Sequence, residues 1–166
     1  MEILGDVRGY ESRTEKVLAE YGIGRDEFVQ CDTLCYECNT NERYEEVKQA
    51  LVRSAVLLSE RPTNGREVSI LEVNPSVELG SWSIPYIELL QPKPTRENID
   101  GIDCVFFVTK TPIRDFYEKH PDVPFEPKGL KNEHHPYIEL KGDGVAIKFH
   151  DMNFGQVVEL EQSTNG

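Results

Sequence analysis

Hydrophobic and polar positions show two different periodicities along the chain, and together these periodicities predict a mixture of helices and strands. Apolar residues recur every three or four positions in some segments, and alternate or form short continuous runs in others. The helical spacing predicts helices over residues 10–21, 41–60 and 112–119. The alternating and apolar runs predict strands over 27–37, 66–73, 77–90 (one strand or a bent pair), 102–108, 137–140 and 145–149.

Residues that favour turns separate these segments. Asn64-Gly65 is a strong turn signal, and Gly142-Asp143-Gly144 is typical of a hairpin. Asn39, with Glu42 three residues later, offers a cap for the second helix. The polar segment 91–101 carries two prolines and is typical of a linker between two halves of the chain.

A repeated pentapeptide indicates that those halves are similar. Pro85-Tyr86-Ile87-Glu88-Leu89 recurs as Pro136-Tyr137-Ile138-Glu139-Leu140, and a strand carrying Asp and Cys precedes each copy. We therefore predict an α+β fold in one domain, residues 1–166. Two tandem βαβββ modules, about 27–92 and about 101–160, are expected to form a cupped mixed sheet after an N-terminal helix. A cleft should lie between the modules.

Charge and composition narrow the function classes. The 166 residues suffice for one compact domain, and 30 acidic against 18 basic residues give a net charge of −12. That field repels phosphate backbones, so no nucleic-acid partner is expected. No apolar run is long enough to cross a bilayer, and the first residues lack the pattern of a signal peptide. These features predict a cytoplasmic protein without a membrane partner.

The four cysteines raise the alternatives of zinc, disulfides and core thiols. Cys31, Cys35 and Cys38 lie where a strand is expected, so Cys31 and Cys35 should share one face and Cys38 the other. No second pair of closely spaced cysteines follows, since Cys104 is distant, and this argues against a zinc knuckle. We expect reduced, partly buried thiols.

Several stretches carry a family resemblance. They are Asn64-Gly65-Arg66 before an alternating strand, Trp82-Ser83-Ile84 leading into a strand, and the segment from Val145 to His150 before a short acidic end. With the tandem modules and the leading helix, they resemble the YecM-type family of the vicinal oxygen chelate superfamily, which includes glyoxalases and extradiol dioxygenases. The resemblance runs from about Val7 to Glu161. It implies one metal site in the cup, with ligands from the first and last strands of each module.

The positions that the resemblance assigns to this metal site are only partly filled with ligand residues. The family's Asp-His pair corresponds here to Asp32-Thr33, and its second acid-His pair corresponds to Asp103-Cys104. The other two positions are Glu88 and Lys148. Glu88 and a Cys104 thiolate are the metal ligands that remain, for zinc or iron, whereas a catalytic zinc usually has three protein ligands.

Cys35 and His150 complete the predicted pocket, because on regular strands they share the faces of Thr33 and Lys148. The pocket is expected to consist of Thr33, Cys35, Glu88, Cys104, Lys148 and His150. One hypothesis is a non-standard zinc site of Cys35, Glu88, Cys104 and His150. The other, which we favour, is a metal-free pocket in which Lys148 neutralises Glu88.

Other residues could contact a ligand but have ordinary structural explanations. His134-His135 would point to opposite faces of a strand, so an exposed loop is expected there. Arg66 could bind a ligand carboxylate, although a solvated arginine is commoner. Trp82 could stack on a ligand, but such a residue more often packs in a core.

Two functions from different classes are compatible with these features. The favoured prediction is a small-molecule or partner-binding protein with a degraded metal site, which holds its ligand in the cleft between the modules and has no certain cofactor. The alternative is a metal-dependent lyase, isomerase or dioxygenase-like enzyme with zinc or iron at a non-standard site. A homodimer formed through the sheets is a further expectation.

Overall fold

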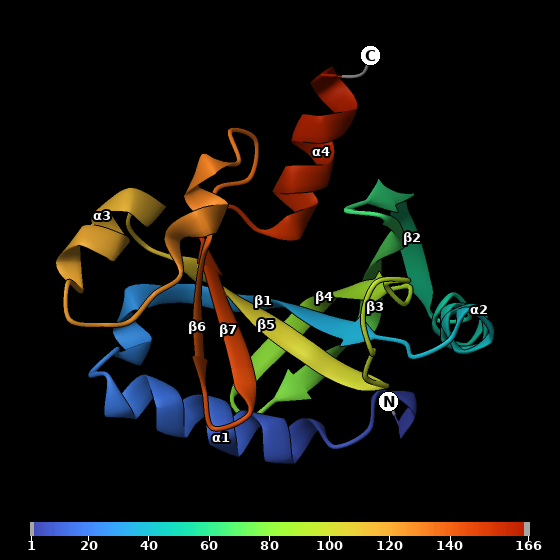
Figure 1. The fold of residues 1–166 in the computed structure, drawn as a ribbon, viewed down its shortest axis with the longest axis horizontal. Helices are drawn as coiled ribbons and strands as arrows, with labels where there is room; N and C mark the ends of the chain where they lie inside the picture. The colour runs from blue at the N-terminus through green and yellow to red at the C-terminus, as the bar shows by residue number, and fades with distance from the viewer. Residues whose placement is uncertain (1, 165–166) are drawn as a thin grey trace.

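The computed structural model describes residues 2–164, in which seven strands form one curved sheet (Figure 1). The strand order is β2-β3-β4-β1-β5-β7-β6. β1 is parallel to β4 and antiparallel to β5, and β5 is parallel to β7. The pairs β4-β1 and β7-β5 therefore correspond to each other in the two halves. This arrangement confirms the predicted α+β fold of two modules side by side in a cupped mixed sheet.

The N-terminal helix packs across one face of the sheet, below the strands in Figure 1. The segment comprises η1 (Glu2–Leu4), α1 (Val7–Glu20) and η2 (Arg25–Glu27). α1 begins three residues before the predicted start because the Asp6 carboxylate caps it, accepting a hydrogen bond from the Gly9 amide at 2.9 Å.

The first module contains a hairpin where the sequence pattern had predicted the second half of a helix. Its elements are β1 (Phe28–Glu37), α2 (Asn41–Leu51), β2 (Ala55–Thr63), β3 (Arg66–Leu79) and β4 (Trp82–Leu90). The predicted helix over 41–60 is wrong beyond Leu51. Asn64 and Gly65 both have positive φ, 51° and 81°, which is the geometry of a two-residue turn between adjacent antiparallel strands. The residues before that turn must therefore be a strand.

Two boundaries in this module also differ from the prediction. The cap of α2 is Thr40, whose hydroxyl accepts from the Arg43 amide at 3.0 Å, and not Asn39. β3 continues through Asn74-Pro75 to Leu79 instead of ending at residue 73. A register irregularity between Glu72 and Val77 accommodates the proline, which has no amide to offer to β4.

The second module is a shortened copy of the first. Its elements are β5 (Gly101–Thr109), α3 (Ile113–Lys119), η3 (Pro127–Lys131), β6 (Ile138–Gly142), β7 (Val145–His150) and α4 (Phe154–Thr164). The strand that would correspond to β2 is reduced to a single bridge between Glu126 and Glu139. Four prolines between 121 and 136 explain this, because proline cannot donate to a strand ladder.

α4 was absent from the prediction, although the sequence carries a signal for it. Asn153 and Gln156 cap its start reciprocally, each side chain accepting from the other residue's amide at 3.0 Å. The helix lies over the face of the sheet opposite α1 (Figure 1). Among residues 2–164, no helix is long and apolar enough to span a membrane.

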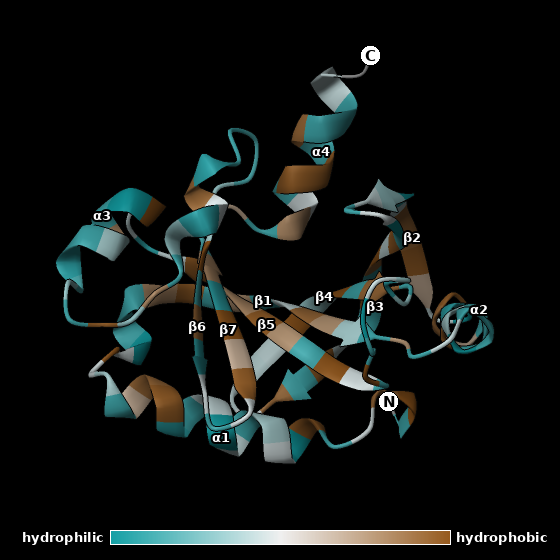
Figure 2. Ribbon diagram, in the orientation of Figure 1, coloured by the Kyte–Doolittle hydropathy of each residue, from teal (hydrophilic) through white to brown (hydrophobic). Residues whose placement is uncertain are grey.

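The two faces of the sheet carry separate apolar clusters. The larger packs against α1, α2 and α3, and the smaller lies under α4, which shows alternating apolar and polar bands in Figure 2. A bulge between Cys31 and Thr33 shifts the alternation of β1, so Cys31 faces the larger cluster and Cys35 the smaller one. The expectation that they share a face was wrong. All four cysteines are free and buried, as predicted.

Candidate ligand-binding cup

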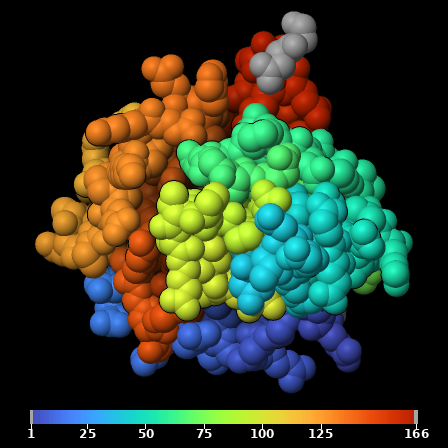
Figure 3. Space-filling model, turned by 45° about the vertical axis from the view of Figure 1, so that its right-hand side comes forward, coloured from blue at the N-terminus to red at the C-terminus, as the bar shows by residue number. Residues whose placement is uncertain are grey.

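A cavity of about 270 Å³ lies on the concave face of the sheet, between the two modules and beside α4. We call it the cup. In Figure 3 it opens between the orange segment before β6 and the yellow-green loop that follows β4. Its lining includes the charged residues Arg61, Arg66, Glu88, Lys93, Asp103, Lys148 and Glu161, together with Phe106, His135 and Tyr137.

The strand register brings four of the six predicted pocket residues together. Cys35 pairs with Glu88 on β4 and with Cys104 on β5, and Lys148 of β7 pairs with Phe106 of β5. Glu88 and Lys148 line the cup, whereas both thiols are buried beneath it. Thr33 and His150 have no exposed surface and do not line the cup.

The Cys35 thiol is a hydrogen-bond donor to Glu88. The distance from Cys35 Sγ to Glu88 Oε2 is 2.9 Å. Burial, together with neighbouring Cys104 and Glu88, raises the pKa of Cys35 well above its ordinary value, so this residue stays a thiol. The predicted ion pair between Glu88 and Lys148 does not form: the carboxylate paired with Lys148 is Glu139, at 3.9 Å.

This donor set does not fit a divalent metal. The protonated Cys35 thiol is a poor metal ligand. Lys148 brings a positive charge to the same cluster. The surrounding groups, of which Cys104 has the largest effect, raise the pKa of Lys148 although burial opposes this. Both ring nitrogens of His150, which the zinc hypothesis required as a ligand, are hydrogen-bonded, one to His135 and the other to Asp32. Within the part of the chain that the structure describes, no three His, Cys, Asp or Glu side chains are grouped to hold a metal ion.

The Lys148 ammonium is surrounded largely by aromatic faces. It lies 5.3 Å from the centre of the Phe106 ring and 5.2 Å from that of Tyr137, both within range of a cation–π interaction. Glu139 is only a loose partner, because it also binds Lys141 at 2.9 Å. Lys148 therefore offers the cup a positive charge that no carboxylate neutralises closely.

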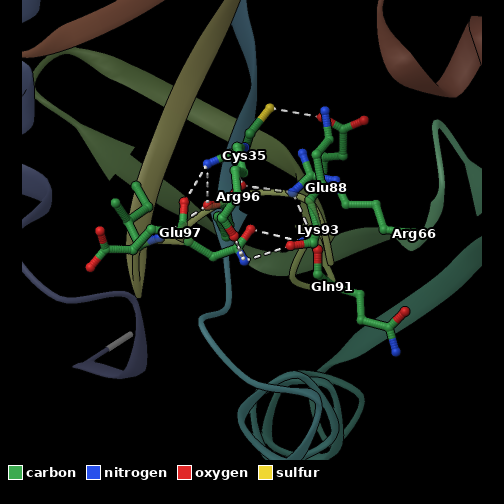
Figure 4. A network of polar contacts seen from close by, with 10 residues as sticks. Cys35, Arg66, Glu88, Gln91, Lys93, Arg96 and Glu97 are labelled. Atoms are coloured by element: carbon green, nitrogen blue, oxygen red, sulfur yellow. Dashed lines mark hydrogen bonds and ion pairs between the residues drawn. The ribbon is translucent and has the colours of Figure 1, made fainter.

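A second positive group lies at the rim of the cup, around one buried carboxylate. Glu37, at the end of β1, has no exposed surface and accepts hydrogen bonds from Arg66 at 2.7 Å, from Arg96 at 3.1 Å and from the Ile99 amide at 3.0 Å. Burial alone would raise the pKa of Glu37, but these bonds lower it. Figure 4 shows Arg66, Lys93 and Arg96 gathered in one network beside Glu88 and Cys35.

The segment after β4 is an ordered loop that positions these cations. The Asn98 side chain accepts from the Lys93 amide at 2.8 Å and donates to the carbonyls of Lys93 and Arg96, both at 2.9 Å. This segment was predicted only as a linker, and Arg66 was predicted to be solvated. The Arg66 expectation was wrong, since its side chain is only 9% exposed.

Two histidines and an aspartate form a hydrogen-bonded chain under the other wall of the cup. Asp32, in the bulge of β1, contacts His150 at 2.8 Å, and His150 contacts His135 at 2.8 Å. The expectation of an exposed His134-His135 loop is wrong for His135, which is half-buried, packs on Phe106 and lines the cup. Periodicity could not place it, because the proline-rich segment before β6 has no regular structure.

Trp82 lies on the opposite side of the sheet. Its ring packs edge-on against Phe107 with centroids 5.6 Å apart, and it borders a second cavity of about 240 Å³ beside α1. That cavity is lined mainly by apolar residues such as Leu18, Ile23 and Leu79. Trp82 therefore does not contribute to the cup.

Comparison with known proteins agrees with this fold. The chain is 22% identical over 150 residues to Protein YecM of Escherichia coli (strain K12), covering 81% of this chain and 80% of that protein. A solved structure described as Protein EC4020 overlays with a TM-score of 0.80, at 19% identity, over 97% of this chain and 92% of that one. A hypothetical protein from Bacillus halodurans C-125 overlays with a TM-score of 0.49, at 17% identity, over 72% of this chain and 91% of that one.

A family model also matches this chain over nearly its whole length. The model for the YecM protein family covers residues 1–161. It therefore includes both modules, the loop with Lys93 and Arg96, and most of α4. The chain belongs to the YecM protein family.

Proposed function

We propose that this protein binds a small organic anion, most directly a carboxylate, in the cup. The observation that carries the proposal is the group of Arg66, Lys93 and Arg96 around the single buried carboxylate of Glu37. Taken by themselves, these three cations and Glu37 carry two excess positive charges, in a protein whose net charge is −12, while Glu88 and Asp103 are carboxylates elsewhere in the lining of the cup. A local field of that sign attracts an anion from solution.

Lys93 is the cation best placed to receive it. Its ammonium has no hydrogen-bond or ion-pair partner among residues 2–164, although the residue lines the cup. Burial lowers the pKa of Lys93, and the positive charges of Arg66 and Arg96 lower it further. A bound carboxylate would relieve that repulsion, and Lys148 would face the same anion from the floor of the cup.

The metal-dependent alternative has weaker support from the donor groups. A lyase, isomerase or dioxygenase of this fold would need a metal held by Glu88, Cys104 and further ligands. The Cys35 thiol donates a hydrogen bond to Glu88, and Lys148 supplies a fixed cation in the same place. An ammonium can balance the charge of a bound carboxylate without any metal ion.

The test is calorimetric titration with succinate at pH 7.5 in low salt. We expect saturable binding that weakens as salt is added, and a loss of about 5- to 10-fold in affinity in Lys93→Gln. Lys110→Gln makes the same chemical change on an exposed residue at the far end of β5 and should bind like the wild type. Absence of binding, an equal loss in both variants, or binding abolished by an uncharged chelator such as 1,10-phenanthroline would each contradict the proposal.

A further inference from the structure

The chain of hydrogen bonds from Asp32 to the cup has a defined direction. Asp32 Oδ1 lies 2.8 Å from His150 Nε2, and His150 Nδ1 lies 2.8 Å from His135 Nε2. Asp32 and His150 have no exposed surface, whereas His135 is half-buried and lines the cup. The chain therefore starts at a sealed carboxylate and ends at a ring that a ligand can reach.

The positions of the protons on the His150 and His135 rings follow from the hydrogen bonds of Asp32. The other oxygen of Asp32 accepts from the Phe154 amide and from the Thr33 hydroxyl, both at 2.9 Å, which is the hydrogen-bonding pattern of a carboxylate that only accepts. An ionised Asp32 can only accept, so His150 Nε2 donates to it. A neutral imidazole has one donor and one acceptor, so His150 Nδ1 accepts and His135 Nε2 donates. His135 Nδ1 is then left with a lone pair.

That lone pair belongs to an atom with accessible surface, on a residue that lines the cup. Every buried side-chain nitrogen or oxygen in residues 2–164 has a hydrogen-bond partner, and His135 Nδ1 has none, so this atom is not sealed. The ring is held between Phe106 and Phe154, with centroids 5.7 and 5.2 Å away. Burial, His150 and Lys148 lower the pKa of His135 to about 3, which keeps the ring neutral near pH 7.

We infer that the ligand of the cup is a hydroxy acid, whose hydroxyl donates to His135 Nδ1 while its carboxylates pair with the cations of the cup. This inference rests on the proposed function and adds one requirement, which is that the ligand carries a hydroxyl that can donate a hydrogen bond. Lys148, whose ammonium makes no hydrogen bond within residues 2–164, can donate to the same hydroxyl oxygen. A methylene in place of the hydroxyl would leave both groups unpaired, and a ketone would leave His135 unpaired.

The volume of the cup suits a small acid, so malate, succinate and oxaloacetate form a matched series of probes. We expect the better-binding enantiomer of malate to bind at least about tenfold more tightly than succinate and oxaloacetate at pH 7.5. In His135→Phe, which keeps an aromatic ring against Phe106, the preference for malate over succinate should fall below about twofold, with little change for succinate.

The outcomes separate this inference from the proposed function. Equal binding of malate and succinate to the wild type overturns the inference and leaves the anion site intact, whereas failure of all three acids to bind overturns both. A second measurement does not depend on any variant: nitrogen NMR of the imidazoles should show His135 Nδ1 without a proton. A protonated Nδ1, which a positively charged His150 would impose, also overturns the inference.

Discussion

Replacing Glu37 by Gln should weaken the fold and strengthen anion binding at the same time. The substitution removes the buried carboxylate that Arg66, Arg96 and the Ile99 amide share. Breaking a buried ion pair costs about 3–5 kcal/mol, and we expect the lower end, about 3 kcal/mol, because Arg96 is 43% exposed and stays solvated. For a chain of this length that corresponds to a melting temperature about 6–12 °C lower.

The same change adds a positive charge to the rim of the cup. We expect succinate to bind Glu37→Gln about 5- to 10-fold more tightly than the wild type. Thermal and urea unfolding measure the first effect, and calorimetric titration measures the second. Glu97→Gln is the matched control, because Glu97 is exposed in the same loop and should change neither quantity by more than about 0.5 kcal/mol.

The pH dependence of the Glu37 effect has a definite sign. The pKa of Glu37 is lowered from its ordinary value of 4.5 in the folded protein. Its stabilisation is therefore fully present above pH 4.5 and is lost as the pH falls through the lowered pKa. The stability difference between wild type and Glu37→Gln should shrink in that window. A difference below about 1 kcal/mol at pH 7, or weaker succinate binding in the variant, would refute the reasoning.

Three further predictions follow from the cup and the thiols around it. Protein purified from metal-supplemented medium should contain far less than one equivalent of zinc or iron by elemental analysis; a full equivalent that Glu88→Gln removes would contradict the donor argument. Because the pKa of His135 is lowered from 6.5 to about 3, the wild type should lose stability as the pH falls from 6.5 towards 3, and His135→Phe should lose less; parallel curves would count against this. All four buried cysteines should resist a disulfide reagent in the native protein and react in denaturant. A cysteine that reacts rapidly in the native protein would show that its thiol is accessible and not buried.

The sequence predicts the fold well wherever local chemistry and tertiary packing agree. The alternating run of β7 and the turn at Gly142-Asp143-Gly144 appear as expected, with Asp143 and Gly144 at φ of 47° and 73°. The error over 52–60 arose because Leu51, Ala55 and Leu58 match helical spacing, while the hairpin partner that makes this segment a strand lies beyond the turn. Periodicity within a window cannot include a partner outside it.

Prediction of the site depended on the family resemblance and on strand alternation, and it missed residues in the loops. The family resemblance assigned Glu88, Cys104 and Lys148 to one site, and the strand register of the structure brings them together with Cys35. Lys93 and His135 were missed because one lies in a loop and the other in a proline-rich segment, where side-chain direction follows from tertiary hydrogen bonds. His150 was expected in the pocket, but its bond to Asp32 depends on the bulge in β1, which alternation alone does not reveal.

The proposed anion site lies on the concave face of the sheet and not on the α1 face. Amide NMR spectra recorded during titration with succinate test this most directly. The amide signals of Lys93, Ile99, His135 and Phe154 should shift and saturate together, with the indole signal of Trp82 unchanged. Shifts centred on Trp82 and Leu18, or no saturable shifts around the cup, would contradict it.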